Sequence, residues 1–145
     1  MTNSQYIDAY KKAQQSSNSV TSSHEIVRTL MKELVNSMQK IVLDIQDERK
    51  RKQDNYTVDK VFEEKNARHK SKNLSKALSI IYGLQTSLDF DKALEIANNL
   101  FQLYEYCRHE IIKGFSQKIE DGIIRAIDVI KQIMEGWEEI PSLDK

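Results

Sequence analysis

Three histidines and one cysteine are the side chains of this chain that could hold a metal ion or serve as a nucleophilic centre: His24, His69, His109 and Cys107. No two histidines lie four residues apart, the spacing that places two ligands on one face of a helix, and Cys107 and His109 point in divergent directions on a helix. The many carboxylates include no Glu-x-x-His motif of the kind that binds di-iron centres in helical bundles. The sequence therefore predicts no metal site, no cofactor and no enzymatic activity.

The cysteine and the N-terminus bear on the cellular compartment. Cys107 lies on an apolar helical stripe and has no second cysteine to pair with, so we expect a buried thiol in a reducing cytosol. Residues 1–10 lack the apolar core of a signal peptide, and no apolar run approaches the roughly 20 residues needed to span a bilayer. These features predict a soluble cytoplasmic protein that does not insert into membranes.

The charge pattern argues against nucleic acid as a partner. Basic and acidic residues balance at 22 each, so no overall field attracts polyanions. The basic run at 49–52 is flanked by Asp47, Glu48 and Asp54 and has no neighbouring aromatic platform. We interpret this run as the solvated end of a helix, where its cations favour the negative helix terminus.

Apolar residues at three- and four-residue steps, few breakers and many helix formers predict an all-α single domain spanning 1–145. The expected helices cover 22–46, about 57–88, 90–113 and 116–139. The middle two form a hairpin. Residues 47–73 are expected to form a charged, partly mobile connection, and residues 1–21 a mobile arm that either staples to its own core or caps a binding site.

Several short polar motifs predict where these helices begin and end. Ser22 and Glu25 fit a capping box, and the segment 87–91 offers side chains that can accept hydrogen bonds at the start of the third helix. Gly114 is a predicted C-cap and Ser116 a predicted N-cap for the last helix.

The helix from 91 to 112 carries more apolar surface than two neighbours in a bundle normally cover. Its main stripe is flanked by Leu94, Phe101 and Ile112 on one side and by Asn99 and Tyr106 on the other. A larger core or a homodimer would bury this surface, and so would an amphipathic helix of another protein lying in a groove. Periodicity leaves both explanations open.

The chain resembles the FliS-type flagellar export chaperones. The resemblance is carried by Lys76-Ala77, Ile80-Ile81, Leu84, Ser87-Leu88-Asp89, the run 95–100 and the run 103–106, and at the two ends by Tyr6-Ile7-Asp8-Ala9-Tyr10 and Trp137-Glu138-Glu139-Ile140. The chain departs from the family pattern at Ala93-Leu94, where a Gly-Gly pair is usual, at Ser22-Ser23, where Ser-Pro is usual, and in its longer connection at 47–73.

This resemblance implies an antiparallel four-helix bundle with a short N-terminal arm. Such a chaperone binds the disordered C-terminal segment of flagellin as helices in apolar grooves, prevents premature polymerisation and delivers flagellin to the type III export gate, without catalysis. Tyr104 and Trp137 are expected in the core. The expected partner-binding residues are the arm residues Ile7 and Tyr10, together with Leu94, Asn99, Phe101, Leu103 and Tyr106. The alternative is a divergent paralogue that acts as a self-associating structural or regulatory bundle.

Overall fold

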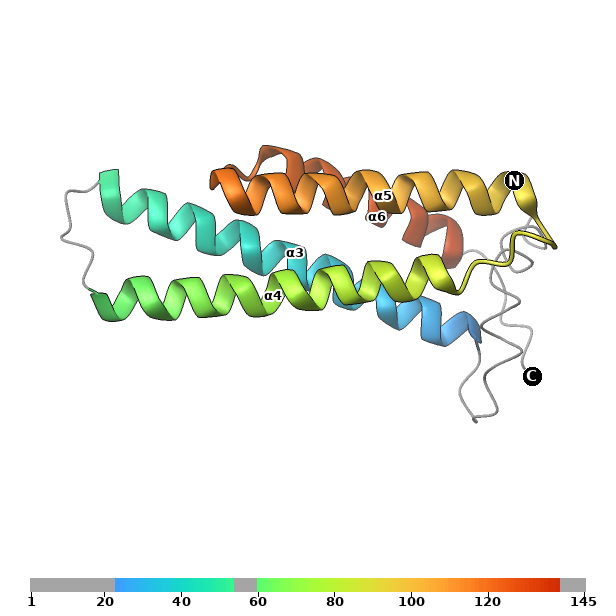
Figure 1. Ribbon diagram of the computed structural model, residues 1–145, viewed down its shortest axis with the longest axis horizontal. Helices are drawn as coiled ribbons and strands as arrows, with labels where there is room; N and C mark the ends of the chain where they lie inside the picture. The colour runs from blue at the N-terminus through green and yellow to red at the C-terminus, as the bar shows by residue number, and fades with distance from the viewer. Residues whose placement is uncertain (1–22, 54–59, 139–145) are drawn as a thin grey trace.

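The computed structural model describes residues 23–53 and 60–138, and these form four α-helices. They are α3 (Ser23–Gln53), α4 (Lys60–Thr86), α5 (Leu94–Gln117) and α6 (Asp121–Glu138). Helix α3 packs against α4 and α6, and α5 packs against the same two helices (Figure 1). Helices α3 and α4 run antiparallel, because Glu33 contacts Lys76 whereas the later Glu48 contacts the earlier Lys70. Helices α3 and α6 also run antiparallel, because Arg28 contacts Glu138 whereas Arg49 contacts Glu120. The predicted all-α bundle is confirmed.

The core is the junction of the four apolar stripes. Because residues three and four apart share a helix face, each helix turns one row of aliphatic side chains inward. Tyr104 and Trp137 are buried in this core, as expected, and Cys107 is fully buried. The largest wholly buried side chains besides these aromatics are Met31, Leu34, Met38, Ile41, Ile45, Ile81, Leu84, Ile111 and Ile123.

The segment 47–73 was expected to be a charged, partly mobile connection overlapped by a helix from about 57, and its described residues, 47–53 and 60–73, are helical. The predicted end of the first helix at 46 is wrong. Helix α3 continues to Gln53 and α4 begins at Lys60, which leaves only 54–59 outside the described residues. Ion pairs of Arg51 with Asp47 and of Lys52 with Glu48, four residues apart, support the last turns of α3. The expected arm at 1–21 and the capping residue Ser22 also lie outside the described residues.

The end of α5 differs from the prediction because Gly114 does not cap it. Helix α5 continues to Gln117, so Ser116 lies inside it, and Lys118 takes the left-handed conformation with φ of 58°. The backbone N–H of Ile119 donates to the carbonyl of Gly114 at 3.1 Å. A Cβ at position 114 would lie 2.7 Å from the carbonyl oxygen of Ile119, so glycine is required here for a close approach of two backbone segments.

The turn between α4 and α5 uses one of the predicted acceptors, but for a different purpose. Asp89 Oδ1 accepts hydrogen bonds from the backbone N–H groups of Asp91 at 3.0 Å and Lys92 at 3.2 Å. These bonds close a turn before the helix. Helix α5 then begins at Leu94, and the Ala93 before it makes no side-chain capping bond.

The first turns of α3 and the last turn of α6 are held together by a reciprocal contact. Trp137 Nε1–H donates to the carbonyl of His24 at 2.9 Å, and His24 Nε2 lies 3.1 Å from the carbonyl oxygen of Trp137. The two rings stack with centroids 5.1 Å apart. Arg28 and Glu138 form an ion pair beside them. We call this set of contacts the His24–Trp137 clasp.

Candidate partner-binding site

Helix α5 exposes apolar side chains on both sides of its buried stripe. One exposed row faces the α4 side and the other faces the α6 side, because α5 lies between these two helices. Each row borders the line along which α5 meets its neighbour. The two rows together form the candidate site, and each is considered in turn.

The α4-side rim consists of Tyr82, Phe90, Leu94, Phe101 and Ile112. Phe101 is placed on this side by Gln85 of α4, whose amide donates to the Phe101 carbonyl at 3.4 Å. Leu94 precedes Phe101 by seven residues and therefore shares its face. Tyr82 lies three residues before Gln85 and is 68% exposed, while Leu94 is 60% exposed. The rim is therefore an open apolar row on the bundle surface.

Aromatic rings fix one end of this rim. Phe101 is half-buried and packs against the core, and the ring of Phe90 meets it edge-on with centroids 6.1 Å apart. Leu94 stands free of this packing at the start of α5. A ligand helix crossing here would meet a rigid aromatic base and an adaptable leucine.

A polar network crosses the middle of the α4-side rim. Gln85 donates to Glu105 at 2.9 Å, and Arg108 donates to both carboxylate oxygens of Glu105 at 3.1 and 3.0 Å. The hydrogen bonds from Arg108 and then from Gln85 lower the pKa of Glu105 below its ordinary value. The network therefore stays charged at neutral pH and divides the apolar row into two parts, with Ile112 beyond it.

The α6-side rim consists of Asn99, Leu103 and Tyr106. Glu110 follows Tyr106 by four residues and lies 3.9 Å from Arg125 of α6, which places this row beside α6. Asn99 is exposed, Leu103 is 38% exposed and Tyr106 is half-buried. This rim is shorter and more polar than the α4-side rim.

The structure divides the predicted site residues between the two rims. Leu94 and Phe101 lie together on the α4 side, whereas Asn99, Leu103 and Tyr106 lie together on the α6 side. The buried stripe of α5 separates them. The two predicted arm residues, Ile7 and Tyr10, lie outside the described residues.

Sequence reasoning missed two members of the α4-side rim. Phe90 lies in the segment expected to cap a helix, so its ring was not assigned to a surface. Tyr82 follows the core residue Ile81, and only its three-residue step to Gln85 signals that it borders α5. Neither position could be placed without knowing which side of α4 faces α5.

The described residues were also searched for groups of metal ligands and for helices that could span a membrane. No group of three or more His, Cys, Asp or Glu side chains within 23–53 and 60–138 is placed to hold a metal ion. Over the same residues, no helix is both long enough and apolar enough to cross a bilayer.

Comparison of the sequence with known proteins identifies a family. The sequence model of the family described as flagellar protein FliS matches residues 6–143. The flagellar secretion chaperone FliS of Vibrio cholerae is 29% identical over 136 residues, which cover 93% of this chain and 88% of the relative. The flagellar secretion chaperone FliS of Salmonella typhimurium is 35% identical over 72 residues, covering 49% of this chain and 53% of the relative.

A third relative, the flagellar secretion chaperone FliSB of Pseudomonas aeruginosa, is 28% identical over 67 residues, covering 46% of this chain and 53% of the relative. A separate comparison with solved structures found no match. The family match spans nearly the whole chain, from residue 6 to residue 143. The helical bundle, the exposed rims of α5 and this match lead to one conclusion: the chain belongs to the FliS family of flagellar secretion chaperones.

Proposed function

We propose that this protein binds the C-terminal segment of flagellin in the bacterial cytosol, keeps it from polymerising and delivers it to the flagellar type III export apparatus. The observation that carries the proposal is the α4-side rim, where Leu94 and Tyr82 are each at least 60% exposed and share one side of the bundle with Phe90, Phe101 and Ile112. The relatives are named flagellar secretion chaperones, which supports an exported flagellar client.

The rims suit an amphipathic segment that folds as it binds. An apolar row along a helix can receive side chains at i, i+3, i+4 and i+7 of a client helix. A client that is disordered when free loses chain entropy on ordering, which lowers the affinity for a given buried area and allows release at the export gate. The α4-side rim is the main contact in this proposal, and Asn99, Leu103 and Tyr106 of the α6-side rim receive a second part of the client.

The main test is titration of the flagellin C-terminal region with single-residue variants. We expect Leu94→Glu to weaken binding by at least about ten-fold, because a carboxylate would replace an apolar side chain that the bound client covers. Leu103→Glu tests the α6-side rim in the same way. Leu43→Glu is the matched control, since Leu43 is 62% exposed on α3 and lies outside both rims.

Isothermal titration and circular dichroism give the readouts. We expect a strongly negative heat-capacity change and a gain of helicity when the flagellin region binds the unmodified protein. A far-ultraviolet spectrum equal to the sum of the two components at saturation would contradict coupled folding. Equal losses of affinity for Leu43→Glu and Leu94→Glu would contradict the assignment of the rim.

The arm is tested separately with Tyr10→Ala. If the arm caps the rims, the variant binds the flagellin region more tightly, because the client no longer competes with the arm. If Tyr10 contacts the client directly, the variant binds more weakly. An unchanged affinity would remove the arm from the mechanism.

A self-associating bundle is the second candidate, because a second copy could cover the same exposed rims. Sedimentation equilibrium distinguishes the two. A structural dimer would be favoured if the mass doubles as the concentration rises, if Leu94→Glu abolishes this doubling, and if the protein has no affinity for flagellin.

A further inference from the structure

The hairpin of α3 and α4 projects beyond the other two helices at the end opposite to Leu94. Helix α5 ends beside Lys118, whose ammonium group reaches Glu48 at 3.0 Å, yet α3 continues from Glu48 to Gln53. Figure 1 shows α3 and α4 extending past the end of α5 on this side. At this end the bundle therefore narrows from four helices to two, α3 and α4. We call the place where α5 ends the step.

A cleft of about 480 Å³ lies at this step. Its apolar walls include Phe62 and Ala67 of α4 and Phe115 of α5. This volume falls within the range of sites that hold a ligand or a few side chains of a partner. The cleft is distant from the Leu94–Phe101 part of the α4-side rim, because Lys118 follows Phe101 by 17 residues, or about 25 Å of helix. Ile112, at the other end of that rim, lies three residues before Phe115 of the cleft.

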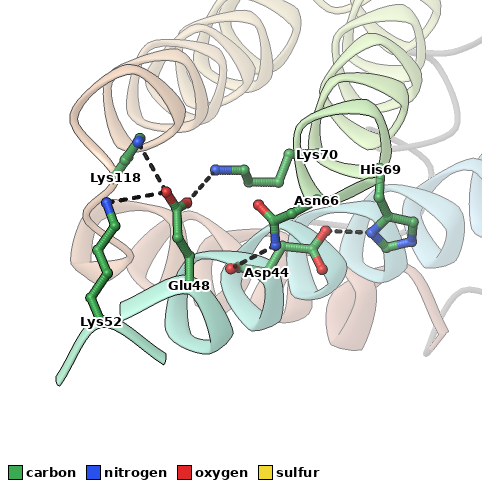
Figure 2. Close-up of polar contacts among 7 residues, drawn as sticks. All are labelled: Asp44, Glu48, Lys52, Asn66, His69, Lys70 and Lys118. Carbon is green, nitrogen blue, oxygen red and sulfur yellow. Dashed lines mark hydrogen bonds and ion pairs between the residues drawn. The ribbon is translucent and has the colours of Figure 1, made fainter. Parts of the chain in front are cut away.

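The polar wall of the cleft is unbalanced in charge. Glu48 accepts hydrogen bonds from Lys70 at 2.8 Å and Lys118 at 3.0 Å, and Lys52 lies 3.5 Å from it (Figure 2). One carboxylate thus faces three ammonium groups. Glu63 also lines the cleft, which leaves one net positive charge among these five side chains.

The three lysines are not equivalent. The Lys70 side chain is only 8% exposed and is committed to Glu48, whereas the side chains of Lys52 and Lys118 are both more than half exposed. Each ammonium group has three N–H donors, so Lys52 and Lys118 keep donors for an external acceptor. Two cations at the mouth of an apolar cleft can therefore attract an anionic group.

The residues around the cleft add to its positive charge. Residues 47–53 and 60–73 together carry nine basic and four acidic side chains, although the whole chain is balanced. The fold also brings an aromatic ring to the basic run, since the guanidinium of Arg51 lies 3.8 Å from the ring centroid of Phe62. The sequence had suggested a solvated helix end without an aromatic neighbour. The structure corrects that view.

We propose that this cleft is a second docking site, which binds an acidic segment of a partner protein. A carboxylate of the partner is held by Lys52 and Lys118, and an adjacent apolar side chain packs against Phe62 and Phe115. The lysines converge on one point instead of forming a stripe along which a phosphate backbone could run. Phe62, Ala67 and Phe115 add an apolar wall that an apolar side chain of a peptide can contact. These features favour a peptide over a nucleic acid.

The test uses a short synthetic peptide of acidic residues with a central Phe-Leu pair, and the same peptide with Gln and Asn in place of Glu and Asp. We expect saturable, salt-sensitive binding of the acidic peptide to the full chain, and at least about five-fold weaker binding to Lys52→Gln/Lys118→Gln. Lys32→Gln/Lys131→Gln is the matched control, since both lysines are exposed elsewhere on the bundle. Equal affinity of the cleft variant and the unmodified protein would overturn the proposal.

Amide chemical shifts of the unmodified protein give a second readout that does not depend on how well a variant folds. We expect peptide-induced shifts at 48–52, 62–71 and 115–118, and shifts confined to other residues would overturn the site. Single-stranded DNA and vesicles of anionic lipid are titrated in parallel. If either one binds more tightly than the peptide, and if this binding is lost in the cleft variant, that ligand and not an acidic peptide is the occupant of the cleft. Flagellin affinity should be unchanged in the cleft variant, so failure of this proposal is distinguishable from failure of the flagellin proposal.

Discussion

Gly114 is a residue at which the fold leaves no room for a side chain. We expect Gly114→Ala to lower the free energy of unfolding by about 1–3 kcal/mol, because the added Cβ would lie 2.7 Å from the Ile119 carbonyl and from the Ile123 side chain. Urea unfolding followed by circular dichroism measures the change.

Gly83 is the matched control, because a Cβ added there meets nothing within 4 Å. Gly83→Ala should stabilise α4 by up to about 1 kcal/mol through helix propensity alone. The two glycine variants are therefore expected to have opposite signs. Stabilisation by both would show that the α5–α6 turn adapts more readily than this geometry allows.

Glu48 makes stability depend on pH. Burial by itself would raise the pKa of Glu48, but the hydrogen bonds and charges of Lys70 and Lys118 outweigh it and lower the pKa from 4.5 to about 2. Because the folded pKa is depressed, the stabilisation is fully present above about pH 4.5 and is lost as pH falls towards 2. We expect Glu48→Gln to cost about 2–4 kcal/mol at neutral pH, since it leaves Lys70 buried without a charged partner.

The measurement is the free energy of unfolding as a function of pH. Between pH 4.5 and pH 2 the Glu48→Gln protein should show a flatter slope than the unmodified protein. Glu33→Gln is the control, because Glu33 pairs with Lys76 on an exposed face and its loss should change the slope little. Parallel slopes for the unmodified and Glu48→Gln proteins would argue against this cluster as a source of acid sensitivity.

The thiol of Cys107 is predicted to be unreactive towards thiol reagents in the folded protein. Burial, and secondarily the charge of Glu110, raises the pKa of the Cys107 thiol to about 12, so almost no thiolate is present at pH 8. We expect a thiol reagent to label the chain only after denaturant is added. The chain has one cysteine, so rapid stoichiometric labelling in native buffer would directly contradict this burial.

At the scale of the helices, the sequence predicted their number and core faces but not their ends. Apolar periodicity is a local signal, and it located all four stripes. Helix α3 runs to Gln53, beyond the predicted end at 46, and this part of α3 pairs with α4, as in the contact of Lys70 with Glu48. Charged sequence without an apolar stripe cannot reveal such pairing.

The His24–Trp137 clasp joins two helix ends and can be tested as a unit. Trp137→Phe keeps most of the buried ring but removes the N–H that donates to the His24 carbonyl. We expect a loss of about 1–3 kcal/mol in the free energy of unfolding, because the part-buried hydrogen bond to the His24 carbonyl is lost and the smaller ring fills less of the core. Thermal unfolding measures it, and Tyr82→Phe is a control at a 68% exposed ring. Equal melting temperatures for both variants would show that the clasp bond contributes nothing.

At the scale of the whole molecule, the candidate site could be predicted only in part. The excess apolar arc of α5 was visible in the sequence. Its division into an α4-side rim and an α6-side rim was not, because it depends on which helix lies on each side. The basic cleft was hidden for the same reason, since Lys52, Lys70 and Lys118 meet only after three helices have packed.

Leu94 of the α4-side rim and the basic cleft lie at opposite ends of α5, so we expect a change at Leu94 and the cleft to act independently. Leu94→Glu should leave the affinity for the acidic peptide within about two-fold of the unmodified protein, as is usual for distant sites without shared contacts. Fluorescence anisotropy of the labelled peptide measures this affinity. A large change would indicate that α5 transmits strain between its ends.

The clasp also constrains the order in which the chain folds. His24 and Trp137 are 113 residues apart in sequence, so bringing them together closes nearly the whole chain into a loop. Closing a loop of that length costs about 4 kcal/mol of chain entropy beyond a constant term, and the α3–α4 and α4–α5 hairpins can form without it. We therefore expect the clasp to close after the folding transition state, so that Trp137→Phe accelerates unfolding and leaves the folding rate nearly unchanged.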